Sequence, residues 1–455
     1  MRRPSTPVLL LLLAAGVLVS YSSSLGTATM ALALGAPVML LMIAIVPLAA
    51  LAAILVASTQ LTGGRFPLAG YNLLPEHVVL VAFGCALFVR CSAGLLRRAA
   101  VYEVLLLAWI AWNLVVSLLY APRSGRSLAI VAWMILAWLI LWCLRSYFLA
   151  EPAGRKRVLD VGAWVAAAVG AVSFALWAVA LLGGPDIGVQ PEFLTGSLAA
   201  KGPTLEANFL GTQELCWLFL GLHGRLLHDE RPSPWKVAGV LLGIVASMTR
   251  AVWIATLLVL CAAFVAHLRR RPKAAEPAAR RGIARPVAVG LLAIVLMVGG
   301  PQVEKLTASF DFGSGTAAAR LTNWRIAWDD VTGSDAYLTG LGTNSYGQRH
   351  LSRTMPGEPD YLGNLPLMVL YDSGLIGVVL FGGAMAALVV RGRSAQDRLL
   401  RLVFVLALMI VGAATNPVWL GFVWVTVAVL DTHPEDVTEH LSGVGAAERQ
   451  AGIGT

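Results

Sequence analysis

Two arginines lie next to apolar or aromatic residues, where a positively charged side chain needs access to water or to an anionic partner. Arg250 separates two apolar runs in VASMTRAVWIATLL, and a guanidinium in such a place either reaches the membrane interface or faces an aqueous cavity. Arg320 is followed by Trp324 and Trp328 at helical spacing, which puts a cation beside two aromatic rings. Guanidinium groups bind anionic oxygens through paired hydrogen bonds. We expect both arginines to contact an anionic ligand; the alternatives are an interfacial anchor at Arg250 and an amphipathic surface helix around Arg320.

Arg320 belongs to the one long polar segment that lies between apolar runs, residues 302–364. The same segment contains the glycine-rich stretch 340–347. Such a stretch can approach a ligand closely or bind an anion through backbone N–H groups, although it more often forms a turn. Arg325 has an acidic partner four residues later, Asp329, which favours a structural role for that arginine. We expect the chemistry of the chain to lie in this segment.

The rest of the chain is mostly apolar, with 58% hydrophobic and 13% charged residues. These values exclude a soluble globular domain. Apolar runs recur that are long enough to cross a hydrocarbon core of about 30 Å as helices. The sequence therefore predicts an all-α polytopic membrane protein with 12 to 14 transmembrane helices and one large extracytoplasmic loop containing short helices. The five cysteines lack metal-ligand spacing, so we expect no metal and no cofactor.

The predicted spans divide the chain into four parts. These are an N-terminal transmembrane bundle over residues 1–301 with a cytoplasmic linker near 269–285, an extracytoplasmic loop over 302–364, C-terminal transmembrane helices over 365–430 and a disordered cytoplasmic tail over 431–455. The spans are expected at residues 8–19, 28–57, 75–92, 101–119, 127–149, 158–182, 204–226, 235–249, 251–268, 286–301, 365–390, 398–414 and 416–430. Pro37 and Pro47 interrupt the second span, which is either two short helices or one kinked helix.

Lysines and arginines at the span ends predict the orientation, because cytoplasmic loops are enriched in them. Six clusters fall on one side of the membrane if residues 28–57 form a hairpin. They are Arg2/Arg3, Arg90/Arg97/Arg98, Arg145/Arg155/Lys156/Arg157, Arg225/Arg231/Lys236, the linker Arg269–Arg285 and Arg391/Arg393/Arg398/Arg401. That side is expected to be the cytoplasm, and residues 302–364 then lie outside. The net charge of +9 is explained by this topology better than by nucleic-acid binding.

Several motifs together resemble the O-antigen ligase and Wzy-type polysaccharide polymerase family, whose multi-pass members carry one large periplasmic loop late in the chain. The matching pieces follow one another between residues 200 and 380. They are Gly202-Pro-Thr-Leu-Glu206-Ala-Asn208, Thr249-Arg250-Ala251, Arg320 followed by Trp324 and Ala327, the stretch from Leu338 to Tyr346, and Asn364 followed by Tyr371-Asp-Ser-Gly374. Each motif alone is loose, and the resemblance depends on their order, their spacing and their shared side of the membrane.

One position departs from the family pattern. Family members usually carry a His-Asn pair before the glycine matched by Gly374. The histidine is implicated in activating the acceptor, which is the molecule that receives the glycan in the family's reaction. Here Gly363 stands at the histidine position and only Asn364 remains. His350 lies in the same loop at another offset, and we expect it to be a solvated residue without that role.

The resemblance implies a metal-independent glycosyltransferase that moves a glycan from an undecaprenyl-diphosphate-type donor to a sugar or lipid-glycan acceptor at the outer face of the plasma membrane. The expected partners are the polyprenyl-diphosphate-linked glycan, the acceptor and membrane lipids, with no nucleic acid. The diphosphate gains negative charge as its bond to the sugar breaks, and fixed guanidinium groups stabilise that charge. We expect Arg250 and Arg320 to do so. The substrate-binding candidates are Trp324, Asn208, Tyr346, Asn364 and Asp372.

Three carboxylates are candidates for the base that takes the proton of the acceptor hydroxyl. Glu206 opens an apolar span on the outer side, and it is either this base or a helix N-terminal carboxylate. Asp360 lies in the loop, and Asp372 lies in a span-like segment where it could equally pair with an arginine. Two other classes also stay open. A lipid-linked oligosaccharide transporter, or flippase, would be expected to show internal repeats, and a non-catalytic envelope assembly protein is favoured by the missing histidine.

Overall fold

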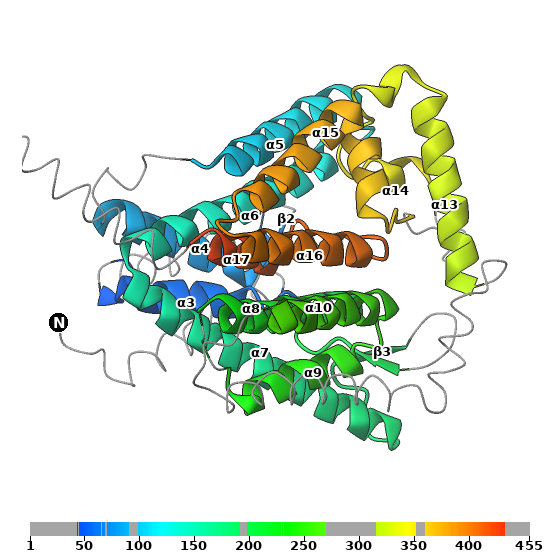
Figure 1. The fold of residues 1–455 in the computed structure, drawn as a ribbon. Coiled ribbons are helices and arrows are strands. Elements are labelled where there is room, and N and C mark those ends of the chain that lie inside the picture. Colours follow the sequence, from blue (N-terminus) through cyan, green and yellow to red (C-terminus); the bar gives the residue numbers. More distant parts are fainter. Residues whose placement is uncertain are drawn as a thin grey trace, which may run out of the picture.

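The computed structural model of the protein is a helical bundle with two short antiparallel β-hairpins (Figure 1). It describes residues 43, 45–64, 66–68, 71–90, 99–191, 198–228, 230, 232–269, 315–351 and 360–432. The predicted first span, the linker beyond Arg269, the span at 286–301 and the tail beyond Thr432 lie outside the described residues. The architecture confirms the predicted all-α fold class.

The described helices include the predicted spans that fall among the described residues, with ends that differ by up to six residues, except that the span 28–57 contains a described helix only after Pro47. They are α3 (Leu48–Ser58), α4 (Pro75–Arg90), α5 (Val101–Tyr120), α6 (Ser124–Ala150), α7 (Pro152–Leu181), α8 (Ala207–His228), α9 (Pro234–Ala246), α10 (Arg250–Arg269), α13 (Gly315–Thr332), α14 (Tyr346–Arg349), α15 (Leu365–Val390), α16 (Ala395–Gly412) and α17 (Gly421–Leu430), with a short 3₁₀ helix η3 (Asp335–Tyr337). The hairpins pair β1 (Phe66–Leu68) with β2 (Tyr71–Leu73), and β3 (Val189–Pro191) with β4 (Leu198–Ala200).

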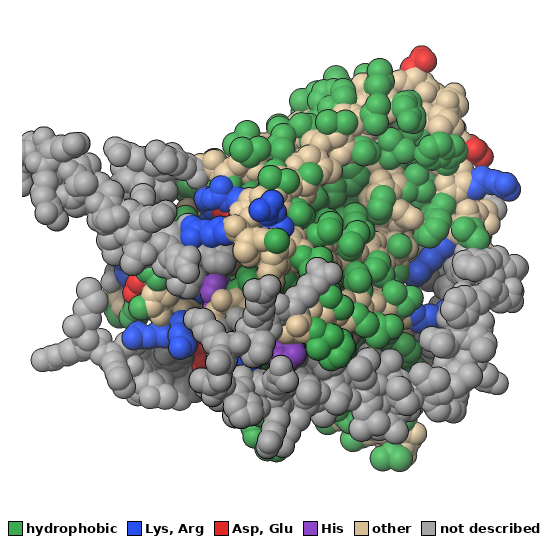
Figure 2. Space-filling model, in the orientation of Figure 1, with side chains coloured by type: hydrophobic (Ala, Val, Ile, Leu, Met, Phe, Trp, Pro, Cys, Tyr) green, Lys and Arg blue, Asp and Glu red, His purple; other side chains and the backbone are tan. Residues whose placement is uncertain are grey.

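Five of the described helices are long and apolar enough to cross a membrane: α5, α6, α7, α10 and α15. The helices α3, α9 and α17 are apolar but shorter. Hydrophobic side chains cover most of the described surface in the view of Figure 2, and lysines and arginines gather near its two ends. This distribution fits a polytopic membrane protein whose charged ends lie outside the hydrocarbon core. The count of 12 to 14 spans stays a prediction.

Small residues bring α9 against α7 and thereby set where α10 begins. The two backbones approach so closely that a Cβ added to Gly170 would lie 2.2 Å from the carbonyl oxygen of Gly239. Glycines permit such contacts between membrane helices because they carry no side chain. Since α9 ends at Ala246 and α10 begins at Arg250, this packing fixes the position from which Arg250 emerges.

A break in α15 holds the glycine-rich part of the loop against the bundle. Gly374 has φ 64° and ψ −166° inside the helix, a conformation that glycine adopts readily. Near this break, the carbonyl oxygen of Tyr371 accepts a hydrogen bond from the Leu341 N–H at 2.8 Å. The carbonyl oxygen of Asp372 accepts one from the Gly342 N–H at 3.0 Å. These two N–H groups are thus used within the fold, which favours the turn over the anion cradle for this stretch.

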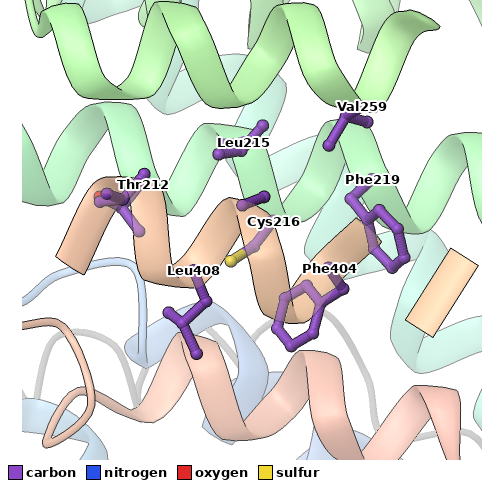
Figure 3. Close-up of a pocket in the computed structure, with 9 residues that line it drawn as sticks. Thr212, Leu215, Cys216, Phe219, Val259, Phe404 and Leu408 are labelled. Carbon is purple, nitrogen blue, oxygen red and sulfur yellow. The ribbon is translucent and has the colours of Figure 1, made fainter. Parts of the chain in front are cut away.

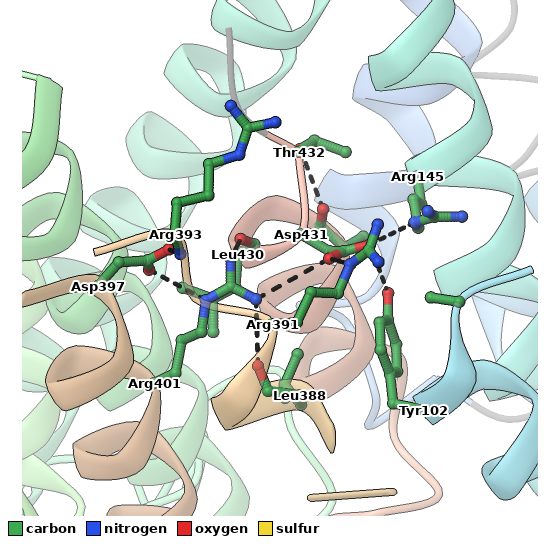
Figure 4. A network of polar contacts seen from close by, with 12 residues as sticks. Tyr102, Arg145, Leu388, Arg391, Arg393, Asp397, Arg401, Leu430, Asp431 and Thr432 are labelled. Carbon is green, nitrogen blue, oxygen red and sulfur yellow. Dashed lines mark hydrogen bonds and ion pairs between the residues drawn. The ribbon is translucent and has the colours of Figure 1, made fainter. Parts of the chain in front are cut away.

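At the other end of α15, arginines from distant parts of the chain surround Asp431 (Figure 4). The carboxylate oxygens lie 2.5 Å from Arg145 Nε and 3.9 Å from Arg401 Nη1, and they also contact Arg391 Nε. The hydroxyl of Tyr102 donates to the same carboxylate at 3.1 Å. Two of the six predicted basic clusters therefore meet at one end of the bundle. Asp431, where the predicted tail begins, is itself buried at the end of α17.

Replacing Asp431 by Ala should strongly destabilise the protein, because the two buried arginines Arg145 and Arg401 would lose a charge partner. Breaking a buried ion pair from one side costs about 3–5 kcal/mol. The matched control is Asp160→Ala, whose carboxylate contacts Lys236 but is 62% exposed; such pairs contribute at most about 1 kcal/mol. Thermal unfolding in detergent measures both, and equal midpoints for the two variants would contradict a stabilising role of the network.

Gly374→Ala should also destabilise the fold. The added Cβ would lie 2.3 Å from the Leu338 carbonyl oxygen, at a backbone φ that L-residues rarely adopt. We expect a loss of about 2 kcal/mol or more from strain and displacement of the loop. Gly382→Ala is the control in the same helix, because its Cβ meets nothing within 4 Å; it should gain about 0.5–1 kcal/mol. Equal thermal stability of the two variants would show that the break is not required.

Candidate functional site

The beginnings of α8 and α10 are joined by a side-chain hydrogen bond. Thr249 Oγ1 donates to Asn208 Oδ1 at 3.1 Å. The connection between α9 and α10 is only three residues long, and Met248 within it has a φ of 51°. Arg250, as the first residue of α10, therefore lies beside the first turn of α8. Glu206 immediately precedes α8 and is exposed, so two predicted site residues, Asn208 and Glu206, lie close to Arg250.

The helix α13 crosses the direction of α10 and α16 at one end of the bundle (Figure 1). Ala327 and Val331 on this helix are fully buried, and they share a stripe with Arg320 and Trp324 at helical spacing. Arg320 and Trp324 are half-buried. Trp328, predicted to extend the cationic stripe, is 50% exposed. The stripe that faces the protein therefore contains Trp324 but not Trp328, although both were predicted to lie beside Arg320.

Tyr361 connects the α13 region with the start of α8. The residue is 44% exposed, yet neighbouring groups desolvate its hydroxyl and raise the pKa; Glu206 raises the pKa further and Arg320 lowers it. Charges influence a titrating group in this way only from nearby. Glu206 and Arg320, which are far apart in the sequence, are thus electrostatic neighbours of one phenol. The turn after α16 also lies near this hydroxyl, through Thr415 and the backbone of Asn416.

Two predicted site residues flank Tyr361 in the chain, and both have local contacts. Asp360 Oδ1 accepts a hydrogen bond from the Tyr361 N–H at 2.8 Å. Asn364 Oδ1 accepts one from the Leu367 N–H at 3.0 Å and thereby caps α15. Capping of this kind satisfies a backbone donor at the helix start. These contacts fix the path of the chain from Asp360 into α15.

Two further predicted residues, Asp372 and Tyr346, lie deeper, where the loop packs on α15. Asp372 is 3% exposed, and its carboxylate lies near the backbone N–H groups of Asn344 and Ser345. Tyr346 is also 3% exposed, and its hydroxyl donates to the Asn323 carbonyl oxygen at 3.4 Å. Both side chains therefore contact the fold itself, at the seam between the loop and the bundle.

His350 was predicted to be a solvated loop residue, and that expectation is wrong. Its Nε2 lies 2.6 Å from Asp330 Oδ2, and the side chain is only 28% exposed. Asp330 Oδ2 also accepts a hydrogen bond from the Tyr371 hydroxyl at 2.9 Å. The ring of Tyr346 lies 4.7 Å from the ring of His350 and 5.4 Å from that of Tyr371. The loop folds back on α13 and thereby brings His350 to Asp330, a contact that the sequence spacing does not predict.

An apolar recess opens between α8, α10 and α16, beginning one helical turn from Asn208 (Figure 3). The recess is small: the centre of a water-sized sphere can move within only about 10 Å³ of it, which is room for about one water molecule. Thr212, Leu215, Cys216, Phe219, Val259, Phe404, Ala407, Leu408 and Val411 line it. The rings of Phe219 and Phe404 meet at 5.3 Å. Its lining is apolar, because every side chain around it apart from Thr212 and Cys216 is fully hydrocarbon.

Comparison with known proteins identifies the family of this region. Residues 237–382 match the family model described as O-antigen ligase. No curated protein matches the chain. The matched residues include Arg250, Arg320 and the α15 break at Gly374, whereas Glu206 and Asn208 lie outside them. The resemblance predicted from the motifs is confirmed, and the chain contains an O-antigen ligase family domain at residues 237–382.

Proposed function

We propose that the protein transfers a glycan from a polyprenyl-diphosphate donor to a sugar or lipid-glycan acceptor at the outer face of the plasma membrane. The observation that carries this proposal is the O-antigen ligase match over residues 237–382, which contains both arginines that the sequence singled out. Arg250 begins α10 beside Asn208, and Arg320 shares the neighbourhood of Tyr361 with Glu206. The two guanidinium groups thus belong to one end of the bundle.

The arginines are assigned to the leaving group. In the proposed reaction the bond between the anomeric carbon and the diphosphate oxygen breaks, and the electron pair stays on the diphosphate. The acceptor oxygen forms the new bond to the anomeric carbon and loses its proton. Arg250 and Arg320 stabilise the negative charge that develops on the diphosphate, and fixed donors do this best where water is scarce. Trp324, half-buried on the same face as Arg320, offers a flat apolar surface to a sugar ring.

The apolar side chains around the recess are compatible with a lipid-linked donor. It begins next to Asn208, because Thr212 at its edge donates a hydrogen bond to the Asn208 carbonyl oxygen at 2.6 Å. A donor with its diphosphate near Arg250 could therefore lay its hydrocarbon chain against α8, α10 and α16, although the recess itself is too small to enclose the chain. Because such a chain moves from lipid and not from water, its contact with these helices would contribute through van der Waals packing.

The arrangement of arginines supports an outer location of the site. The basic clusters around Asp431 lie at the end of α15 that contains Val390, and the loop enters α15 at Leu365. A helix of 26 residues is about 39 Å long, so the two ends of α15 lie near opposite membrane surfaces. Arginines are enriched at the Val390 end, as we expect of a cytoplasmic end. The candidate site then faces outward.

The test is glycan transfer by purified protein in proteoliposomes that contain lipid-linked glycan and acceptor from the membranes of its own source. Arg250→Ala and Arg320→Ala should each lower the transfer rate by about 10²–10³-fold, as expected for loss of a donor to a developing oxyanion. Arg250→Lys should restore only part of the rate, because the paired hydrogen bonds are lost. Arg325→Ala on the exposed side of α13 is the matched control and should transfer normally.

Other outcomes of this assay separate the competing functions. Movement of the lipid-linked glycan across the bilayer without a new covalent bond would identify a transporter. Neither transfer nor movement would leave a structural role in the cell envelope. Transfer at the normal rate by both arginine variants would overturn the assignment of these residues while leaving the enzyme class intact.

A further inference from the structure

The cluster of His350, Asp330 and Tyr371 has the geometry of an oriented base. One carboxylate oxygen of Asp330 contacts both other side chains, His350 Nε2 at 2.6 Å and the Tyr371 hydroxyl at 2.9 Å. The carboxylate thus holds the imidazole in one orientation, while Tyr371 holds the carboxylate. Each group comes from a different part of the fold: α13, the residue after α14, and the first half of α15. A histidine oriented by a carboxylate is a recurrent arrangement in general-base catalysis.

The contact with Asp330 determines which nitrogen is available for chemistry. An ionised carboxylate accepts hydrogen bonds, so Nε2 carries the proton that it shares with Asp330. In the neutral imidazole the lone pair then lies on Nδ1. The side chain of His350 is 28% exposed, which gives solvent and small molecules access to part of the ring. The half-buried position restricts the ring to one orientation and leaves part of the ring accessible to solvent.

The backbone of His350 is joined to the segment that reaches Arg320. Its carbonyl oxygen accepts a hydrogen bond from the Asp360 N–H at 3.0 Å. The next residue is Tyr361, whose hydroxyl responds to both Glu206 and Arg320. One backbone hydrogen bond thus joins His350 to Asp360, and the next residue along the chain, Tyr361, lies near Arg320. By contrast, the carboxylates of Asp360 and Asp372 face backbone N–H groups close to them.

We propose that His350 is the general base for the acceptor and that Asp330 is its positioning residue. This inference rests on the proposed function. The acceptor hydroxyl gives its proton to Nδ1 of His350 as its oxygen bonds to the anomeric carbon of the donor. The bond from that carbon to the diphosphate breaks, and the electron pair leaves with the diphosphate held by the arginines. The charge that develops on the imidazole is stabilised by Asp330, and no further reactant is needed.

The same contacts also join the loop to α13, so a base and a structural latch must be distinguished. His350→Gln separates them, because the Gln amide can still donate a hydrogen bond to Asp330 but cannot take a proton near neutral pH. Asp330→Asn tests the positioning role, since an amide holds the imidazole in its reactive tautomer less well. Arg349→Ala is the control for docking: it removes the side-chain hydrogen bond that ties the same short helix to the Tyr120 carbonyl oxygen without touching the proposed base.

The experiment measures kcat and KM for the donor in the proteoliposome transfer assay, together with thermal unfolding. His350→Gln should lose about 10²-fold or more in kcat, with an unchanged donor KM and melting temperature. Asp330→Asn should lose about tenfold or more in kcat, again without a change in KM. Arg349→Ala should retain the kcat of the unaltered protein. Added imidazole should restore part of the activity of His350→Ala, which a lost latch would not allow.

Activity of His350→Gln near that of the unaltered protein would overturn the inference while the proposed function stood. An equal loss of kcat in Arg349→Ala would also overturn it, because docking of the loop would then explain the effect. Absence of transfer by the unaltered protein would overturn the proposed function and this inference together.

Discussion

The backbone contact between the polar loop and the broken helix α15 is the constraint on which the site depends. At Gly374 the helix leaves its regular path, and the carbonyl oxygens of Tyr371 and Asp372 bind the N–H groups of Leu341 and Gly342. Backbone hydrogen bonds are rigid and independent of side-chain rotamers. A loop joined in this way holds α13 and α14 on the bundle, and through them Arg320 and His350. Without this seam the polar residues of the loop would have no defined relation to Arg250.

The arginines at the two ends of the bundle have different surroundings. At one end, Arg145, Arg391 and Arg401 form ion pairs with the buried Asp431, and this network holds the end of α17 in place. At the other end, Arg250 and Arg320 lie among a phenol, an exposed carboxylate and an apolar recess. The first arrangement uses arginine for structure. In the second, the function that we propose assigns the two arginines to an anionic ligand, the diphosphate of a lipid-linked glycan.

Most of the fold could be predicted from the sequence because membrane spans are local patterns. The run 365–390 coincides with α15, and residues 101–119 differ from α5 by one residue, since apolar length and flanking turn residues determine both. Arg250 at the start of a helix and Arg320 on the same helix face as Trp324 could also be predicted from spacing, whereas Trp328, predicted on that face too, is exposed. The pairing of His350 with Asp330 could not, because it depends on the path of an irregular loop. Tyr361 was likewise missed, since its importance arises only from groups that folding brings near it.

The central claim is that Arg250 and Arg320 hold one diphosphate. A cryo-EM structure of the protein in lipid nanodiscs with a bound polyprenyl-diphosphate sugar tests this most directly. The diphosphate oxygens should lie within hydrogen-bonding distance, about 2.7–3.2 Å, of both guanidinium groups, with the hydrocarbon chain lying against α8, α10 and α16. A diphosphate bound at the Asp431 end, or in contact with neither arginine, would contradict the claim.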